Sequence, residues 1–382
     1  GGPLREYPAK TSGVVVNTDV VSLWRDLHAI PELGFHEVKT SAYAADAMRR
    51  LGYEVHTGFG NTTAVVAYKR TSVPGPTVMV RCDMDALPFK NPDGSVVAVH
   101  ACGHDAHVAM QIATAAQVAD SIKKGTLKFL FQPAEETLDG ALSVIDAGVL
   151  DDVDMAFGMH IRPVQDMPAG SFCAAVNYTA SAFIGIDIKG EACHASRPHL
   201  GVNAAEAASL VTNAICAIKL NPLAGWSCKV TQIHAASAAV NVVPDTAQMW
   251  LDARAENNAL MDELIEKVRR AAEFAAQSVG ATASLVLKHK PIPAPSYTPS
   301  LVRQAQEEII RLFGRERLSE PCGGGGEDFN YFVQAKPELK NAYFGIGVGA
   351  EPGLHNRAMH FSPEFLKGGV ALMSSMICRQ LC

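Results

Sequence analysis

The sequence predicts an α/β protein with a mostly parallel sheet, helices on both faces of that sheet, and an inserted α+β domain. Short apolar runs alternate with helical segments in the first part of the chain, and a different order of elements follows it. A proline-rich stretch then leads back to further helices and a strand. A chain of 382 residues is also long enough for two domains.

The first part begins with two predicted helices within residues 20–52, which are separated at Pro31 and end at Gly52. After these helices the chain contains several continuous apolar runs. Such runs are typical of strands buried on both faces, as in a parallel sheet. The predicted strands are Thr63–Tyr68, Thr77–Arg81, Leu127–Phe131 and Met155–Met159, and the helices between them are His107–Ile122 and Ala141–Val149.

The middle of the chain predicts an inserted two-layer domain over residues 178–292. Its elements are strand Ala182–Lys189, helix Asn203–Leu220, strands Ser227–Ala235 and Thr246–Ala255, helix Ala259–Val279 and strand Ser284–Lys290. This β-α-β-β-α-β order is the split βαβ, ferredoxin-like pattern.

The proline-rich stretch 291–295 predicts a hinge back to the first domain, which then comprises residues 1–177 and 293–382. The returning elements are helix Leu301–Leu312, strand Tyr343–Val348 and a last helix after Ser362-Pro363.

Composition excludes several classes of partner. The chain is 48% hydrophobic and 19% charged, as expected for a soluble protein, and its net charge of −6 without a long basic cluster argues against nucleic acid and anionic membranes. No apolar run reaches the roughly 18 residues of a membrane-spanning helix. Nine scattered cysteines predict reduced thiols and a cytoplasmic location. Because the chain begins Gly1-Gly2-Pro3 without a Met, a removed targeting segment would leave no trace.

Metal-ligand side chains gather near the ends of the predicted strands, where open α/β sheets place their sites. They are Asp83 and Asp85, Glu135 and Glu136, His160, His355, and the segment His100–His107 with its Cys102 and His104. Cysteine, histidine and carboxylate groups together suit a borderline-soft transition metal, and their number exceeds what one tetrahedral ion needs. We therefore expect a two-metal site.

Each of these residues also has a simpler interpretation. A single histidine such as His160 or His355 is more often structural, and the pair Glu135-Glu136 alone would be a solvated helix start. The convergence of five separate stretches at one edge favours the metal site. A closed structural zinc site would instead use tightly spaced Cys/His pairs, whereas this spread-out set leaves room for water and substrate.

The sequence resembles the aminoacylase-type dinuclear metallopeptidases along nearly its whole length. The resemblance is greatest to the amidohydrolase branch that contains hippurate hydrolase, the indole-acetyl-amino-acid hydrolases and N-acetyldiaminopimelate deacetylase. The matching motifs, in chain order, are Leu27-His28-Ala29-Ile30-Pro31-Glu32-Leu33-Gly34-Phe35, Asp83-Met84-Asp85-Ala86-Leu87-Pro88, His100-Ala101-Cys102-Gly103-His104-Asp105, Gln132-Pro133-Ala134-Glu135-Glu136, Met159-His160, Cys193-His194-Ala195-Ser196-Arg197-Pro198-His199, Asn241-Val242-Val243-Pro244, Gly326-Glu327-Asp328-Phe329 and Leu354-His355-Asn356.

The resemblance implies two divalent transition-metal ions per subunit, with zinc, manganese and cobalt as the alternatives. It implies Glu135 as the general base and Asp85 as a carboxylate that orients a ligand, although Asp83 remains an alternative for the second role. The metal ligands that it implies, with a bridging Cys102 thiolate, are Cys102, His104, Glu136, His160 and His355.

In the inserted domain, the resemblance implies that His194 stabilises the oxyanion, commonly from the partner subunit of a homodimer or higher homo-oligomer. His194 is otherwise an ordinary surface-loop histidine. Asn241 and Arg254 match positions that hold the substrate, and the guanidinium of Arg254 suits a carboxylate.

Three features depart from the family pattern. The loop over residues 88–100 is short, so one wall of the pocket is expected to differ. Arg357 stands where the family usually has Pro, and His360 competes with His355 as a ligand, although we favour His355. The segment Gly323–Gly326 is unusually rich in glycine, but it lacks the Lys-Ser/Thr signature of a phosphate-binding loop.

The sequence therefore predicts a metal-dependent amidohydrolase that cleaves a small carboxylate-bearing amide such as an N-acyl amino acid. The same metal site also suits a dipeptidase or a carboxypeptidase. A non-hydrolytic metal-bound scaffold and a biosynthetic relative are alternatives from other classes, but Glu135 argues against a scaffold because a degenerate site has no reason to keep a base.

Overall fold

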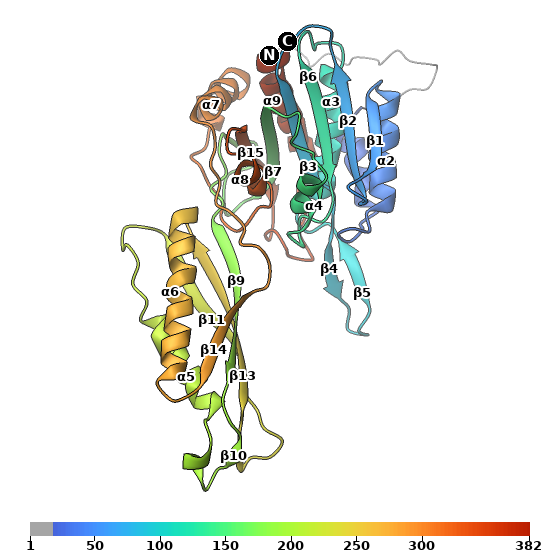
Figure 1. Cartoon of the computed structure of the whole chain (residues 1–382). Coiled ribbons are helices and arrows are strands. Elements are labelled where there is room, and N and C mark those ends of the chain that lie inside the picture. The colour runs from blue at the N-terminus through green and yellow to red at the C-terminus, as the bar shows by residue number, and fades with distance from the viewer. Residues whose placement is uncertain (1–17) are drawn as a thin grey trace. The chain divides into compact units, whose positions relative to one another are not determined.

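The computed structural model describes residues 18–382, so the Gly1-Gly2-Pro3 start lies outside the described part of the chain. The chain divides into two compact units (Figure 1). The first comprises residues up to 177, 296–324 and 328–382, and the second comprises 178–295 and 325–327. Among the described residues, no helix is both long and apolar enough to cross a membrane.

The first unit is built on a seven-stranded mixed sheet in the order β1-β2-β6-β3-β7-β15-β8. The strands are β1 (Glu54–Phe59), β2 (Ala64–Arg70), β3 (Thr77–Asp83), β6 (Thr126–Gln132), β7 (Met155–Pro163), β8 (Phe172–Cys173) and β15 (Lys340–Ala350).

The parallel part of this sheet is its centre, where β6, β3, β7 and β15 are neighbours. The outer pairs β1-β2, β2-β6 and β15-β8 are antiparallel. The prediction of a mostly parallel sheet is therefore wrong at the edges. A continuous apolar run indicates burial but not strand direction, and the tight connection between β1 and β2 permits only a hairpin.

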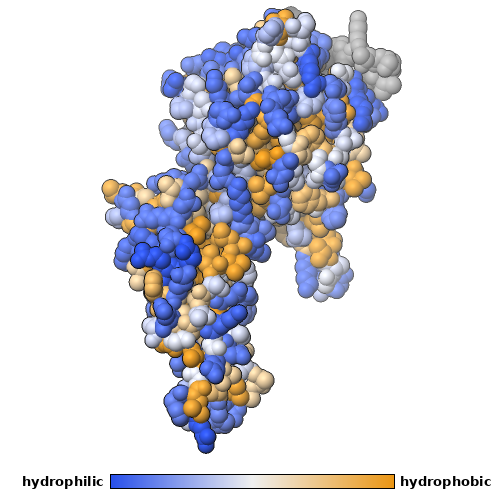
Figure 2. Space-filling view, in the orientation of Figure 1, coloured by the Kyte–Doolittle hydropathy of each residue, from blue (hydrophilic) through white to orange (hydrophobic). Residues whose placement is uncertain are grey.

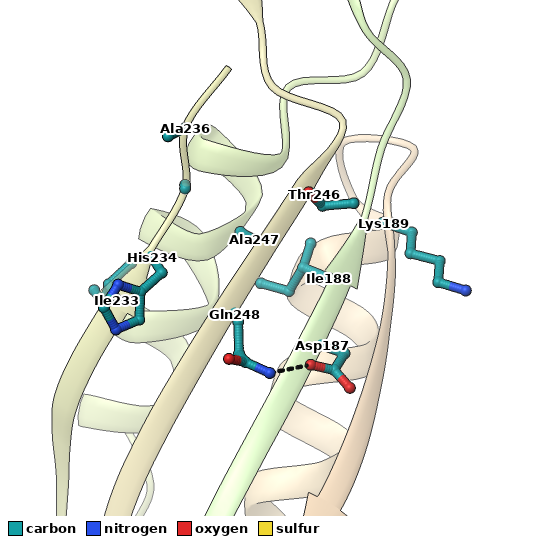
Figure 3. A pocket seen from close by; sticks show the side chains of 10 residues that line it. Asp187, Ile188, Lys189, Ile233, His234, Ala236, Thr246, Ala247 and Gln248 are labelled. Atoms are coloured by element: carbon teal, nitrogen blue, oxygen red, sulfur yellow. Dashed lines mark hydrogen bonds between the residues drawn. The ribbon is translucent and has the colours of Figure 1, made fainter. Parts of the chain in front are cut away.

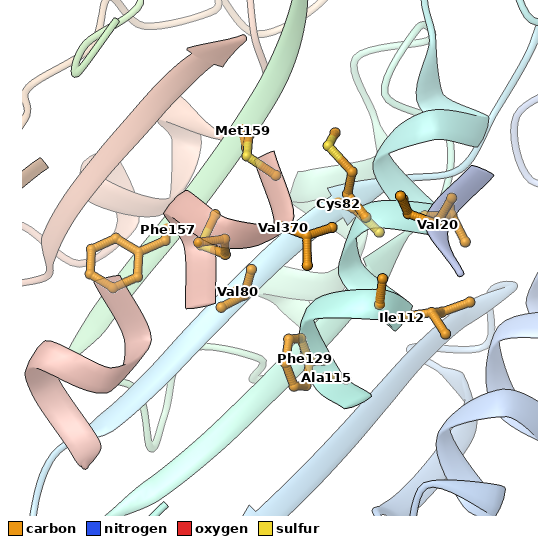
Figure 4. Packing of buried hydrophobic residues seen from close by; sticks show 14 of the residues in the cluster. Val20, Val80, Cys82, Ile112, Ala115, Phe129, Phe157, Met159 and Val370 are labelled. Carbon is orange, nitrogen blue, oxygen red and sulfur yellow. The ribbon is translucent and has the colours of Figure 1, made fainter. Parts of the chain in front are cut away.

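Helices cover both faces of the sheet. They are α1 (Val20–His28), α2 (Val38–Arg50), α3 (His104–Val118), α4 (Gly140–Asp146), α7 (Pro299–Phe313), α8 (Asn330–Ala335) and α9 (Leu366–Leu381). Figure 4 shows the main core, in which Val80, Phe129 and Phe157 of the sheet lie near Ile112 of α3 and Val370 of α9. Residues of α1, α2 and α7 belong to the same cluster.

On the other face of the sheet, two aromatic rings crowd β7, one from β15 and one from the residue before α8. A Cβ on Gly158 of β7 would lie 2.4 Å from the ring of Tyr343 and 3.3 Å from the ring of Phe329. Glycine is therefore needed at this position, immediately before the stretch of β7 that carries His160.

Residues 87–99 form a hairpin of β4 (Leu87–Lys90) and β5 (Val96–Val99), where we expected a plain loop. Its turn is closed by the N–H of Asn91, which donates to the carbonyl of Ser95 at 2.8 Å. Gly94 supplies the positive φ of 86° that this turn needs. The short strands and the Pro88 within them hid the hairpin from sequence analysis.

The second unit has the element order β-α-β-β-α-β. Its elements are β9 (Ala180–Lys189), α5 (Ala204–Cys216), β11 (Trp226–His234), β13 (Thr246–Ala255), α6 (Asn258–Gln277) and β14 (Thr282–Leu287). The strands pair antiparallel in the order β11-β13-β9-β14. A small ribbon of β10 (Cys193–His194) and β12 (Val242–Val243) adjoins them.

The second unit has its own core between the sheet and its two helices. β13 alternates buried and more exposed residues, as a strand covered on one face does. Large hydrophobic side chains of this unit, among them Leu223, Val240 and Phe274, are exposed. Hydrophobic residues lie among hydrophilic ones on the face of the unit seen in Figure 2.

The cysteines are mostly unpaired. Cys378 and Cys382 form a disulfide at the C-terminal end of α9, so the prediction of reduced thiols fails for these two. Their spacing of four residues places them on one face of the helix. The other seven cysteines are free.

Candidate metal centre

The structure brings the five residues implied as metal ligands together in the first unit. Cys102 and His104 lie at the start of α3, Glu136 follows β6, His160 lies within β7, and His355 follows β15. They form two groups, Cys102–His104–His160 and Cys102–Glu136–His355, and the possible ligand atoms in each lie within 4.8 Å of one another. Because Cys102 belongs to both groups, its sulfur is placed as a bridging ligand would be.

Local backbone geometry explains how α3 presents two of these side chains. Gly103 lies between them and has a φ of 82°. A Cβ there would lie only 2.2 Å from the Cδ1 atom of Ile161, so only glycine fits. The N–H of His355 donates to the carbonyl of Ala101 at 2.7 Å, which ties the loop after β15 to the start of α3.

Asp85 connects three residues of the cluster. Its Oδ1 accepts the N–H of Glu135 at 3.0 Å, and its Oδ2 accepts the N–H of Glu136 at 2.9 Å. Oδ1 also lies 3.2 Å from Nδ1 of His104. A proton on that nitrogen leaves Nε2 of His104 as the metal-binding atom. The sequence left open whether Asp83 or Asp85 orients a ligand, and this geometry favours Asp85.

Asp83 instead holds His107, a residue that sequence analysis did not single out. Oδ1 of Asp83 lies 2.6 Å from Nδ1 of His107, and Nε2 of His107 accepts the N–H of Ile161 at 3.1 Å. Because that backbone group can only donate, His107 carries its proton on Nδ1. His107 thus supports β7 next to His160. Its position one helical turn after His104 was the signal that could have identified it.

A buried ion pair completes this support. Nη1 of Arg81 donates to Oδ2 of Asp83 at 2.9 Å. Burial opposes ionisation of Asp83, but the neighbouring His104 and His107 rings and the Arg81 guanidinium outweigh it and hold the pKa of Asp83 well below its usual range.

The residues present fit a pair of metal ions. Nε2 of His104 and Oε1 of Glu136 are buried and make no hydrogen bond of good geometry with any residue from 18 to 382. Contacts with the Cys102 and Glu136 side chains raise the pKa of His355 to about 10. Burial raises the pKa of the Cys102 thiol, and a bound cation is what would make it a thiolate. Buried nitrogen and oxygen atoms of this kind, beside a thiol, are the donor set of a transition metal.

Glu135 lies at the edge of the cluster. Its Oε2 is 3.9 Å from Nε2 of His104, and the residue is 7% exposed. His360, the alternative ligand, lies outside both groups that contain Cys102. Its Nε2 is 3.6 Å from Glu351, and its side chain is 71% exposed.

The remaining predicted site residues lie in the second unit. His194 is exposed on β10, its Nδ1 accepts the N–H of Ser196 at 3.1 Å, and its Nε2 lies 3.5 Å from Nδ2 of Asn241. The structure therefore brings His194 and Asn241 together. Arg254 lies near the C-terminal end of β13, roughly 26 Å along the strand from Thr246, the residue at which β13 begins. It donates to Asp252 and Ser181.

A pocket on the second unit does not coincide with this chemistry. Figure 3 shows its lining, in which Nε2 of Gln248 donates to Asp187 at 3.0 Å. None of the predicted catalytic or ligand residues lines it. We therefore place the candidate site at the Cys102 cluster, where the reactive groups are.

Comparisons with known proteins agree with this chemistry. The family model described as peptidase family M20/M25/M40 matches residues 79–379. Thermostable carboxypeptidase 1 of Saccharolobus solfataricus is 33% identical over 87% of this chain and 86% of its own length. N-acetylcysteine deacetylase of Bacillus subtilis is 32% identical over 92% of this chain and 93% of its own. The solved YxeP protein of Bacillus subtilis, a dinuclear metal binding peptidase, has a TM-score of 0.80 and 28% identity, and covers 95% of this chain and 98% of its own.

Proposed function

Because the chain belongs to peptidase family M20/M25/M40, we propose that its Cys102 cluster removes the acyl group from an N-acyl amino acid. The chain is an amidohydrolase, an enzyme that acts on C–N bonds, and its resemblance to the aminoacylase-type metallopeptidases is confirmed. The observation that carries the proposal is the pair of ligand groups that share Cys102, with Glu135 beside them.

We propose that Cys102, His104, His160, Glu136 and His355 hold two divalent ions, zinc, manganese or cobalt. Such ions, when bound, lower the pKa of water and polarise the amide carbonyl. Glu135 accepts the proton of the attacking water and returns it to the nitrogen of the leaving amine. In support, the backbone N–H of Glu135 is held by Asp85, which also contacts His104.

We propose a substrate-binding role for the second unit. His194 stabilises the oxyanion and Asn241 holds the substrate, and the 3.5 Å between their side chains supports a shared role. Residues 178–292 serve as a satellite and dimerisation domain, from which His194 acts on the substrate of the other subunit of a homodimer. The exposed hydrophobic side chains of this unit support an interface. The mostly unpaired cysteines support a cytoplasmic location.

A second candidate function is that of a carboxypeptidase or dipeptidase. The 33% identity to a thermostable carboxypeptidase specifically favours it. Both functions release an amino acid with a free carboxylate, and they differ in what is attached to its nitrogen.

A substrate panel separates the two functions. The metal-loaded protein is assayed with N-acetyl, N-benzoyl and longer N-acyl derivatives of one amino acid and with dipeptides that end in it. We expect kcat/KM to be highest for an N-acyl amino acid, and Glu135→Gln to slow the release by about 10²–10⁴-fold. Faster turnover of the dipeptides would favour the peptidase. No turnover of any member by protein containing two metal equivalents would contradict both and favour a non-hydrolytic scaffold or a biosynthetic relative.

A further inference from the structure

Two cysteines that the metal centre does not use lie side by side in the first unit. Cys173 ends β8 and is buried, whereas Cys322 precedes the segment Gly323–Gly326 and is half-buried. Their sulfur atoms are 3.8 Å apart, although 149 positions separate them in the sequence. Such contact between two free thiols is close to what a disulfide needs.

The backbone holds the two thiols in this arrangement. The N–H of Ser319 donates to the carbonyl of Phe172 at 2.8 Å, and the N–H of Asn177 donates to the carbonyl of Cys322 at 2.9 Å. Residues 172–176 and 318–322 therefore run side by side in parallel, with bridges at both ends. The contact between the thiols is fixed by main-chain hydrogen bonds on either side of it.

The two sulfur atoms differ in their freedom to move. A Cβ on Gly345 of β15 would lie 2.6 Å from the sulfur of Cys173, so this thiol is packed against the sheet. Cys322 is instead followed by Gly323, Gly324 and Gly325, which are exposed. The sulfurs must approach by about 1.8 Å to reach the ~2.05 Å of a disulfide bond. The glycine-rich side of the pair can supply this movement.

The two thiols also differ in reactivity. The hydrogen bond from the Cys173 thiol and the nearby Arg162 guanidinium lower the pKa of Cys322. The same contact with Cys322, together with burial, raises the pKa of Cys173. A half-buried thiol with a lowered pKa beside a guanidinium is the kind that reacts with oxidants, and a buried thiol in contact with it is placed to resolve the product.

We propose that Cys173 and Cys322 form a redox-active pair that peroxide converts into an intrachain disulfide. The thiolate of Cys322 attacks one oxygen of hydrogen peroxide, which breaks the O–O bond and gives a sulfenic acid and hydroxide. The sulfur of Cys173 then attacks the sulfur of Cys322, and the S–O bond breaks as water leaves with the Cys173 proton. The two cysteines lose two electrons to the peroxide, and a dithiol reductant reverses the change.

The cross-link restrains a junction in the chain. Cys322 lies three residues before 325–327, the short stretch that belongs to the second unit, and the chain returns to the first unit at Asp328. Oxidation therefore adds a covalent link between this crossing segment and β8, to which main-chain hydrogen bonds already join it.

The test uses the full-length, metal-loaded protein treated with graded hydrogen peroxide. Free thiols are alkylated, and the disulfides are mapped by mass spectrometry before and after dithiothreitol. We expect a linked peptide pair containing Cys173 and Cys322, lighter by two hydrogens than the separate peptides, which dithiothreitol releases. Hydrogen exchange at the amides of residues 319–327 is expected to be slower in the oxidised protein.

Single variants distinguish the roles of the two thiols. In Cys173→Ser, Cys322 is expected to stop at the sulfenic acid, which dimedone traps, and in Cys322→Ser, Cys173 is expected to remain reduced. Cys216→Ser, which removes an exposed thiol on α5 far along the chain from both cysteines, is the matched control and should leave the linkage unchanged. The proposal is overturned if Cys173 and Cys322 of the wild-type protein stay unlinked at peroxide concentrations that oxidise Cys216. Unchanged hydrogen exchange at the amides of residues 319–327 in the linked protein would show that the disulfide does not restrain this segment.

Discussion

Replacing Asp85 by Asn tests whether this carboxylate organises the metal centre. Asp85 faces three N–H donors, those of Glu135, Glu136 and the His104 ring, at 3.0, 2.9 and 3.2 Å. Asn offers one acceptor oxygen, and its NH₂ group points at the N–H donors that the second oxygen of Asp85 had accepted. In the less damaging orientation, the oxygen keeps His104 and Glu135, and the backbone of Glu136 loses its acceptor.

The size of the effect follows from these contacts. A hydrogen bond to a charged group contributes about 1.5–3 kcal/mol, and removing a partner that orients a metal ligand typically costs about 10–100-fold in metal affinity or activity. The two figures agree, because about 1.4 kcal/mol corresponds to a factor of ten. We therefore expect Asp85→Asn to weaken metal binding by roughly 10–100-fold and to lower kcat/KM to a similar extent.

The assay is a titration of the metal-free protein with zinc or manganese in competition with a chromophoric chelator, followed by kinetics with an N-acetyl amino acid. Asp93→Asn is the matched control, because Asp93 makes the same kind of contact, accepting the N–H of Ser95 at 2.9 Å, in an exposed turn. Metal affinity and kcat/KM within about twofold of wild type in Asp85→Asn would refute the organising role.

Glu135→Gln should retain both metals, measured by elemental analysis, and lose about 10²–10⁴-fold in kcat, since a Gln cannot take the proton; substantial residual activity would exclude the role as base. Cys102→Ala should instead lower the metal content itself, because one thiolate serves both ions, and full occupancy would mark Cys102 as a core cysteine. Mixing inactive His194→Ala with inactive Glu135→Gln subunits should restore activity in hybrid dimers. If no activity returns after proven subunit exchange, His194 does not act on the site of the other subunit. Arg254→Ala should lose on the order of 30-fold or more in kcat/KM for free-acid substrates, and much less for substrates whose carboxylate is blocked as an amide.

The sequence predicted the elements of the fold better than their directions. Strands such as Leu127–Phe131 and Thr77–Arg81 were identifiable because both of their faces are buried, and they correspond to β6 and β3. β1 was missed, because its exposed residues Glu54 and His56 break the apolar pattern. Pairing direction depends on connections and long-range contacts, which a local pattern does not contain.

Sequence analysis identified the ligand residue types but not the contacts that orient them. Asp83 and Asp85 are two residues apart, and both look suited to orient a ligand. Only the folded chain separates them, since Asp85 receives the N–H groups after β6 whereas Asp83 receives His107 and Arg81. The pair Cys173–Cys322 was equally invisible, because 149 positions separate residues that the fold brings into contact.

Arg254 shows how a structural role and a binding role can be told apart. Its guanidinium already donates to Asp252 at 2.7 Å and to Ser181 at 2.5 Å, and it is about one-third exposed. If those contacts are its whole function, Arg254→Ala weakens the second unit and reduces kcat/KM equally for acid and amide substrates. If its remaining donors bind the substrate carboxylate, only the acids lose the charged contact, whose truncation costs about 2–5 kcal/mol. The ratio of the two losses therefore isolates the binding role, and Arg254→Lys sharpens it, since Lys keeps the charge but loses the paired geometry of the guanidinium.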